Sequence, residues 1–558
     1  MRQRWLEAGR AWRPARPRPL PPAEHARILA RSRIERHGGL TALYLSGTPY
    51  EMGYQHGVLA RDRIHGFRRA AYTYVTSMVQ QAVQRGLPSW LVRPLLFYQS
   101  AAYWPTIPED LALEMQGIAD GAGVHPIEVL VSTAIWEIYL VSGCSEFAAV
   151  APVTAGDSLL HGYNYDLMHP DHALIQPYLA VLFYRPATGN PFFTVNTVGS
   201  VGANAGMNQA GISVAWDNTY LRNDELTRGL RGVMVPFVIT LRRLLQHAGS
   251  LDEAIQTVTG TLPRSLGDII IVGSAGEGES VALETAGRVH AVREMEGGVV
   301  WSTNCFRSPL LAPHDRRGDG RNLPQAGGWQ RFPRTMAYRQ LFAAHQGQLG
   351  PAVAAGFLRD PYPREAAGFV HPNPAPRATI CRAITSWSLV MEPGTGRLWV
   401  SDTELPAPQG RFFAFDLPGW QRRPDLDLAA TGYQAALRCA RRFLDRDWPG
   451  AWLALDEARA LDGGTAPLLM MQAMLHGLTG EEAAAVEALQ QVIDRWGKTA
   501  VGALARAWLH GAGEQAVVPV PFPSAIQPWV YLRSADGWEH RATAAPVPPA
   551  TQLDAVGE

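Results

Sequence analysis

Cysteine is scarce in this chain of 558 residues, and lysine is almost absent. Its four cysteines show no Cys-x-x-Cys spacing, which excludes a disulfide scaffold and gives no sign of a structural zinc site. Lys498 is the only lysine, and the 50 basic residues balance 50 acidic ones, so net charge favours no nucleic-acid partner. No run of about 18 apolar residues occurs, so we expect no membrane span.

The composition is that of a globular protein, with 47% hydrophobic and 18% charged residues. A chain of this length exceeds one ordinary hydrophobic core, so we expect at least two packing units. The first forty residues contain no continuous apolar segment of the signal-peptide kind, and we expect a cytoplasmic protein. Because no metal-ligand cluster and no nucleotide-binding fingerprint appear, we expect no metal and no cofactor.

The residue pattern divides the chain into five parts. Residues 1–38 form a basic, Pro-rich lead-in, and residues 39–143 form a mainly helical segment with a short strand at 40–46. Short β-rich segments separated by Gly, Asn, Asp and Pro turns fill residues 144–420. Residues 425–515 are alanine-rich and helical, with a spacing that faintly resembles tetratricopeptide repeats, and 516–558 form an extended tail. We therefore predict an α+β fold, a sandwich of two antiparallel sheets between helices, with a C-terminal all-α extension.

The helical and β-rich parts meet at Cys144, in the sequence VSGCS. If the chain is cut before Cys144, the freed α-amine, with an ordinary pKa of about 7.7–8.0, can act as general base for the thiol. The same thiol can make the cut by attacking the carbonyl of Gly143, where glycine permits a strained backbone. The alternative is that Cys144 is a packing residue, which is the commoner fate of a lone cysteine.

Several motifs occur one after another between residues 40 and 417: SGTPYEMGYQHG at 46–57, EMQGIADGAG at 114–123, GCS at 143–145, GYNYD at 162–166, GMNQAG at 206–211 and STNCF at 302–306. Together they resemble the cysteine-type N-terminal-nucleophile hydrolases typified by isopenicillin N acyltransferase (acyl-coenzyme A:6-aminopenicillanic acid acyltransferase). Bile salt hydrolases, penicillin V acylases and acid ceramidase are more distant relatives. The resemblance implies an αββα sandwich, a helical pro-segment over 39–143, self-cleavage of the Gly143–Cys144 bond, and catalysis by Cys144.

The resemblance also implies roles for residues downstream of the cleavage site. Asp166 would orient the new α-amine, and Asn164 lies in the same motif. The side-chain amide of Asn304 would complete the oxyanion hole, where one donor lowers the barrier by about 2.7–4 kcal/mol. Asn218 would line the acyl pocket or assist the oxyanion, and satisfying backbone groups at a strand end is an equal alternative for it.

The chain departs from the family pattern at two positions. Tyr163 stands where many relatives carry an arginine that pairs with the aspartate, and Arg334 or Arg382 is then a candidate replacement. Cys305 replaces a histidine, and we expect it to be a packing residue. Aromatic side chains at Tyr163, Tyr165, Trp216 and Trp301 suggest an apolar acyl pocket, although aromatic residues on strands are more often core.

The leading functional hypothesis is an amidohydrolase or acyltransferase that forms an S-acyl-enzyme from a small amide or thioester donor. Water or an amine can accept the acyl group, so both activities stay open. A non-catalytic scaffold with a degenerate core is the alternative, with the helices of 425–515 as a candidate surface for a protein partner. A thiol protease with a Cys–His pair finds no supporting motif, since the nearest downstream histidine, His161, lies on a predicted strand.

Overall fold

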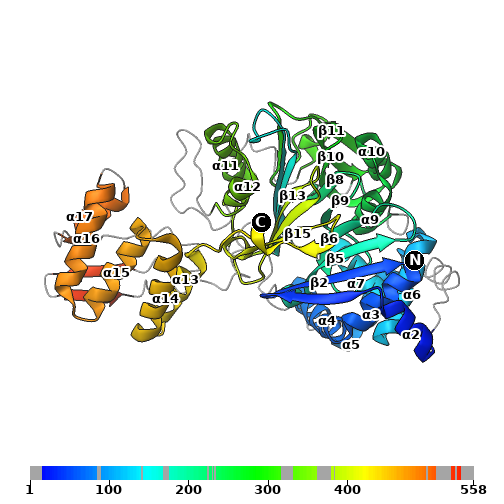
Figure 1. Ribbon diagram of the computed structural model, residues 1–558, viewed down its shortest axis with the longest axis horizontal. Helices are drawn as coiled ribbons and strands as arrows, with labels where there is room; N and C mark the ends of the chain where they lie inside the picture. Colours follow the sequence, from blue (N-terminus) through cyan, green and yellow to red (C-terminus); the bar gives the residue numbers. More distant parts are fainter. Residues whose placement is uncertain are drawn as a thin grey trace.

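Two β-sheets packed face to face form the centre of the molecule (Figure 1). The computed structural model describes residues 16–83, 89–139, 142–167, 175–222, 225–228, 230, 234–315, 331–360, 379–382, 384–497, 500–509, 530–534 and 537–541. Helices cover the outer face of each sheet, and the C-terminal helices lie apart from the sheets. The predicted αββα sandwich with a C-terminal all-α extension is confirmed.

The larger sheet has nine strands, and its first two come from the segment before Cys144. Its strand order is β1-β2-β5-β6-β7-β8-β9-β10-β11. All neighbours pair antiparallel except β2 and β5, which are parallel, so the prediction of purely antiparallel sheets is wrong at this one pair. The bounds are β1 Arg33–His37, β2 Leu40–Gly47, β5 Leu179–Pro186, β6 Phe192–Thr197, β7 Ala205–Asn208, β8 Ile212–Thr219, β9 Arg264–Ser274, β10 Glu279–Gly287 and β11 Val289–Arg293.

The smaller sheet has seven antiparallel strands, in the order β12-β3-β4-β13-β14-β15-β16. Strand β3 begins at Ser142, two residues before the β-rich part predicted from 144, so the Gly143–Cys144 bond lies inside a strand. The bounds are β3 Ser142–Ala149, β4 Leu160–Leu167, β12 Val299–Ser302, β13 Thr385–Glu392, β14 Arg397–Ser401, β15 Phe412–Asp416 and β16 Gln421–Arg422.

Helices from both sides of Cys144 cover the nine-stranded sheet. The bounds are α3 Pro49–Leu59, α4 Arg61–Val83, α5 Ser89–Ala101, α6 Glu109–Ala122, α7 Pro126–Tyr139, α9 Phe237–His247 and α10 Leu251–Gly260. Two of the motifs account for the closest helix contact, because they place glycines where α3 and α6 cross. A Cβ atom on Gly53 would lie 2.0 Å from the backbone oxygen of Glu114, and one on Gly117 would lie 2.2 Å from that of Tyr50. Larger residues would push these helices apart.

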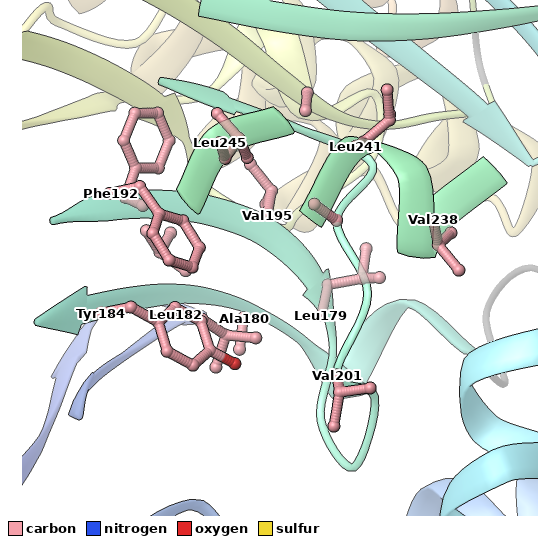
Figure 2. Close-up of a cluster of buried hydrophobic side chains, with 14 of the residues drawn as sticks. Leu179, Ala180, Leu182, Tyr184, Phe192, Val195, Val201, Val238, Leu241 and Leu245 are labelled. Carbon is pink, nitrogen blue, oxygen red and sulfur yellow. The ribbon is translucent and has the colours of Figure 1, made fainter. Parts of the chain in front are cut away.

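An apolar core fills the space between the nine-stranded sheet and α9 (Figure 2). Leu182 and Phe192 project from β5 and β6 on one face of the sheet, and Leu241 and Leu245 project from the helix toward that face. All four are fully or almost fully buried. Helix α10 begins at a cap: Ser250 accepts a hydrogen bond from the backbone N–H of Glu253, while the Glu253 carboxylate accepts one from Gly249.

The outer face of the seven-stranded sheet carries α11 (Arg331–Ala344) and α12 (Pro351–Leu358), which the sequence analysis did not predict. Beyond the sheets, five helices pack around an apolar core of their own, close to the predicted segments. They are α13 Tyr433–Leu444, α14 Trp448–Asp462, α15 Ala466–Leu478, α16 Glu482–Trp496 and α17 Ala500–Leu509.

Two terminal parts differ from expectation. The lead-in predicted over 1–38 contains helix α2 (Pro22–Leu29) and strand β1 in its described part. The tail predicted over 516–558 contains a hairpin, β17 (Val530–Ser534) paired with β18 (Gly537–Arg541). Strand β1 and the hairpin are held by pairing with a neighbouring strand, whereas helix α2 packs against α3.

Candidate functional site

Cys144 lies in the interior of the sandwich, on an uncut strand. In the β3–β4 ladder Gly143 stands opposite Asp166, and Cys144 stands opposite Tyr165. Cys144 is completely buried. Since neighbouring strands lie about 4.8 Å apart, this register places the predicted cleavage site directly beside the predicted aspartate.

The backbone of Cys144 is held on both sides by side chains from the far part of the chain. Its N–H donates to Oδ1 of Asn304 at 3.1 Å, and its carbonyl oxygen accepts from Nη1 of Arg334 at 2.6 Å. Nη2 of Arg334 also donates to Oδ1 of Asn304 at 2.9 Å. Arg334 and Asn304 thus form one buried clamp on the main chain of Cys144.

Asn304 is fixed by a second buried residue, Asp217. Its backbone N–H donates to Oδ2 of Asp217 at 2.6 Å, and its Nδ2 donates to Oδ1 of Asp217 and, at 2.7 Å, to the backbone oxygen of Asn218. Asn304 has a φ of 64°, a left-handed conformation that asparagine tolerates better than most residues. Both amide hydrogens therefore have acceptors in the uncut chain, and the amide oxygen faces the nitrogen of Cys144.

Asp166 forms a buried ion pair with Arg382. Nη1 of Arg382 lies 2.9 Å from Oδ2 of Asp166, and the hydroxyl of Thr385 donates to Oδ1 at 2.6 Å. Burial raises the pKa of Asp166, and the positive charge of Arg382 opposes that rise. Of the two arginines considered from the sequence, Arg382 contacts the aspartate and Arg334 contacts the backbone of Cys144.

The thiol itself faces Tyr163. The Tyr163 hydroxyl lies 3.5 Å from Sγ of Cys144 and is the donor of this contact. The pKa of Cys144 is raised well above its ordinary value, first by burial and then by the negative charge of Asp217, while the Tyr163 hydrogen bond opposes the rise. A thiol in this setting stays protonated until a base removes its proton.

Other predicted site residues lie elsewhere. The Nδ2 atom of Asn164 donates to the backbone oxygens of Leu358 and Ile380, and its Oδ1 accepts from Ser388, so it ties the sheet to its outer layer. Oδ1 of Asn218 lies 3.3 Å from Nδ2 of Asn304, at the edge of the site.

The remaining aromatic and cysteine residues divide between site and core. Trp216 stacks on Phe237 of α9 with ring centroids 3.7 Å apart, and Trp301 packs in the apolar cluster under α11 and α12. Tyr163 and Tyr165 are therefore the two predicted pocket aromatics that lie next to Cys144. Cys305, with the other cysteines, is free and buried.

Asp217 is the residue that the sequence analysis missed. Side chains alternate along a strand, so Ser213 and Asp217 of β8 share a face while Trp216 and Asn218 point the other way. Ser213 contacts His161, and Asp217 contacts Ser302, both on the opposite sheet. The alternation alone separates Asp217 from Asn218, and the contact with Ser302 shows that the face of Asp217 is turned toward the sheet that carries Cys144.

Within the described ranges, no group of three or more His, Cys, Asp or Glu side chains is arranged to hold a metal ion. A search of the same residues finds no helix whose length and apolarity would let it cross a membrane.

Comparison with known proteins agrees with this geometry. Residues 153–322 match the family model described as acyl-coenzyme A:6-aminopenicillanic acid acyl-transferase. This match shows that residues 153–322 of the chain are similar to that family. The matched segment contains Asp166, Asp217 and Asn304, and Cys144 lies nine residues before it.

Two curated relatives and one solved structure illustrate the similarity. A protein of Archaeoglobus fulgidus is 27% identical over 290 residues, which cover 46% of this chain and 45% of that protein. The 40 kDa form of acyl-coenzyme A:6-aminopenicillanic-acid-acyltransferase from Emericella nidulans is 23% identical over 267 residues, covering 47% and 68%. The chain spans about half the length of the first curated relatives that it matches.

The solved structure is a Caenorhabditis elegans ortholog of N-acylethanolamine-hydrolyzing acid amidase. It is 15% identical, with a TM-score of 0.33, and the alignment covers 45% of this chain and 93% of that one. At this score we draw no conclusion from the structural likeness, and the fold rests on the sheets described above.

Proposed function

We propose that this chain is a self-processing cysteine amidohydrolase or acyltransferase in which Cys144, freed by cleavage after Gly143, is the nucleophile. The observation that carries the proposal is the clamp on Cys144: Asn304 accepts from its nitrogen and Arg334 donates to its carbonyl oxygen. Strand β12 ends opposite Glu146, so no strand among the described residues pairs with this edge of Cys144, and the two buried side chains hold its main chain there instead. They fix the backbone at the proposed scissile bond, in register with Asp166.

The first step is the cut. Sγ of Cys144 attacks the carbonyl carbon of Gly143, the C–N bond breaks, and the nitrogen of Cys144 leaves with a proton as the α-amine. Water then hydrolyses the thioester, which releases the Gly143 carboxylate and restores the thiol. Because the bond sits in β3 opposite Asp166, the new amine stays beside that carboxylate and Oδ1 of Asn304.

The second step is acyl transfer. The α-amine takes the proton of the thiol, Sγ forms a bond to the acyl carbon of an amide or thioester donor, and the leaving group departs with a proton from the ammonium. Water or an amine then takes the acyl group from sulfur. Asp166, held by Arg382, orients the amine. The oxyanion role predicted for Asn304 requires its amide to release Asp217 or Asn218 after the cut.

Expression of the full chain tests the proposal. We expect fragments 1–143 and 144–558 on a denaturing gel, with Cys144 at the N-terminus of the larger one. Cys144→Ala should remain uncut and inactive, while Cys439→Ala, which changes another buried free cysteine in the C-terminal helices, should be cut normally.

Activity is measured on the processed protein with N-acyl amino acids, penicillins and acyl thioesters as donors. An uncut wild-type chain that hydrolyses these donors would refute the N-terminal-nucleophile mechanism. A processed chain that reacts with none of them, and whose Cys144 takes up no electrophilic thiol probe, would favour the scaffold alternative.

A further inference from the structure

Tyr163 is the side chain that touches the sulfur of Cys144. It lies on β4 opposite Glu146, two residues along β3 from Cys144, and it is completely buried. Its hydroxyl is 3.5 Å from Sγ, within the range of an O–H to sulfur hydrogen bond. The two arginines of the site point to other atoms: Arg382 to Asp166, and Arg334 to the carbonyl oxygen of Cys144.

The groups behind Tyr163 favour neutral forms. Glu146 is fully buried, and burial raises its pKa well above the ordinary value. Nε2 of His161 lies 3.8 Å from the Glu146 carboxylate, and burial lowers the pKa of this histidine to about 3. Burial, followed by the charge of Cys144, raises the pKa of Tyr163 itself, so its hydroxyl keeps its proton. On the Tyr163 side of Cys144, the sulfur therefore contacts a neutral hydrogen-bond donor.

We propose that Tyr163 is a catalytic residue that donates a hydrogen bond to the sulfur of Cys144 whenever that sulfur carries negative charge. This inference rests on the proposed function and identifies the side chain that donates a hydrogen bond to the Cys144 thiolate. When the α-amine takes the thiol proton, Tyr163 stabilises the thiolate before the C–S bond forms. When the acceptor attacks the thioester and the C–S bond breaks, the electron pair returns to sulfur, and the same O–H stabilises it. Tyr163 keeps its proton throughout.

The test compares Tyr163→Phe with Tyr44→Phe in processed protein. Tyr44 is equally buried, and its hydroxyl contacts Glu35 on the edge strand β1, away from the site. A hydrogen bond to a charged atom predicts a loss of kcat/KM of about ten- to a hundredfold for Tyr163→Phe, with KM little changed, and no loss for Tyr44→Phe. Activity is normalised to the fraction cut before Cys144.

A second readout separates catalysis from packing. The rate of Cys144 alkylation by iodoacetamide is followed against pH, with the modified N-terminal peptide counted by mass spectrometry. Loss of a tenfold thiolate stabilisation should move the midpoint upward by about one pH unit. An unchanged midpoint and unchanged kcat/KM in folded Tyr163→Phe, with wild type active, would overturn the role of Tyr163 and leave the proposed function standing.

If Tyr163→Phe does not accumulate as folded protein, Tyr163→Gln and Tyr163→Met give the same comparison. The two replacements are similar in size, but only glutamine carries N–H donors. We expect Tyr163→Gln to keep a larger share of kcat/KM and a lower alkylation midpoint. Equal values for the pair would overturn the inference. A wild-type chain that is uncut or inactive would instead refute the proposed function.

Discussion

The buried ion pair between Arg382 and Asp166 gives the most direct stability prediction. Arg382→Leu leaves a completely buried carboxylate without its cation. Removing one partner of such a pair usually lowers the free energy of unfolding by about 3–5 kcal/mol. Because the Thr385 hydroxyl still donates to Asp166 at 2.6 Å, we expect the lower end, about 3 kcal/mol. That is a large part of the stability of an ordinary domain.

The loss should depend on pH in a defined direction. Burial already raises the pKa of Asp166, and without Arg382 it rises further. A carboxyl group whose pKa is higher in the folded state than in the unfolded state binds its proton more tightly when folded. Stability therefore falls as pH rises from the unfolded pKa, about 3.9, through the folded pKa. The deficit of Arg382→Leu should be complete above the folded pKa and should shrink toward about pH 4.

Urea unfolding of uncut Cys144→Ala, alone and combined with Arg382→Leu, with Asp166→Asn and with both, measures both effects on one kind of chain. The variant with both substitutions removes both charges, so it should recover most of the lost stability. A deficit that is constant between about pH 7.5 and about pH 4.5 would refute the electrostatic reasoning. A variant with both substitutions that is as unstable as the sum of the single ones would do the same, because independent effects add.

Three further predictions use other contacts. After cleavage, fragment 1–143 should co-elute with fragment 144–558 on gel filtration, because β2 stays paired with β5. Arg242→Ala leaves the buried carboxylate of Glu114 in α6 without its ion-pair partner, so it should lower the urea midpoint at which the two fragments separate. Asp217→Asn, which weakens two hydrogen bonds to Asn304, should slow the appearance of fragments about tenfold or more, as followed by gel densitometry. Gly162→Ala places a Cβ about 2.4 Å from the Phe147 ring and should lower stability by about 1–3 kcal/mol in thermal unfolding, while Gly260→Ala in α10 meets nothing within 4 Å and should not.

The sequence predicts elements whose signal is local, and the structure confirms most of them. The strand predicted at 40–46, for example, is β2, and the helical part predicted over 425–515 contains α13 to α17. In such segments, the spacing of apolar residues and the turn residues at each end determine the structure from positions close together in the sequence. The parallel pairing of β2 with β5 could not be predicted in this way. The two strands are separated by more than a hundred residues, and no residue in either strand specifies the other as its partner.

The candidate site likewise combines residues that the sequence predicts with long-range contacts that it does not. The order of the motifs identifies Cys144, Asp166 and Asn304, and the structure places all three together. The contact between Arg382 and Asp166 joins strand β4 to a loop 216 residues further along, so sequence reasoning could offer two arginines and had no means to choose. The sequence did contain a signal for Asp217, because the alternation of β8 alone separates its face from that of Asn218.

The charges around Cys144 also predict how activity depends on pH. Two aspartates and two arginines lie buried around Cys144, so their formal charges cancel: Asp166, Asp217, Arg334 and Arg382. The proposed cleavage adds an α-amine to this site, and a buried ammonium there would be an uncompensated positive charge, which burial disfavours. The amine should therefore be neutral, and able to act as base, at a lower pH than a free α-amine.

The rising limb of kcat/KM should accordingly lie below about 7.7–8.0, the ordinary range for an α-amino group. Asp217→Asn removes one negative charge and should move the limb further down. Arg382→Gln removes a positive charge and should move it up. Profiles of the processed proteins measure these shifts. If the wild-type limb lies above pH 8, or if the two variants shift it in the same direction, the carboxylates hold the amine as an ammonium and the cancellation of charges does not control the base.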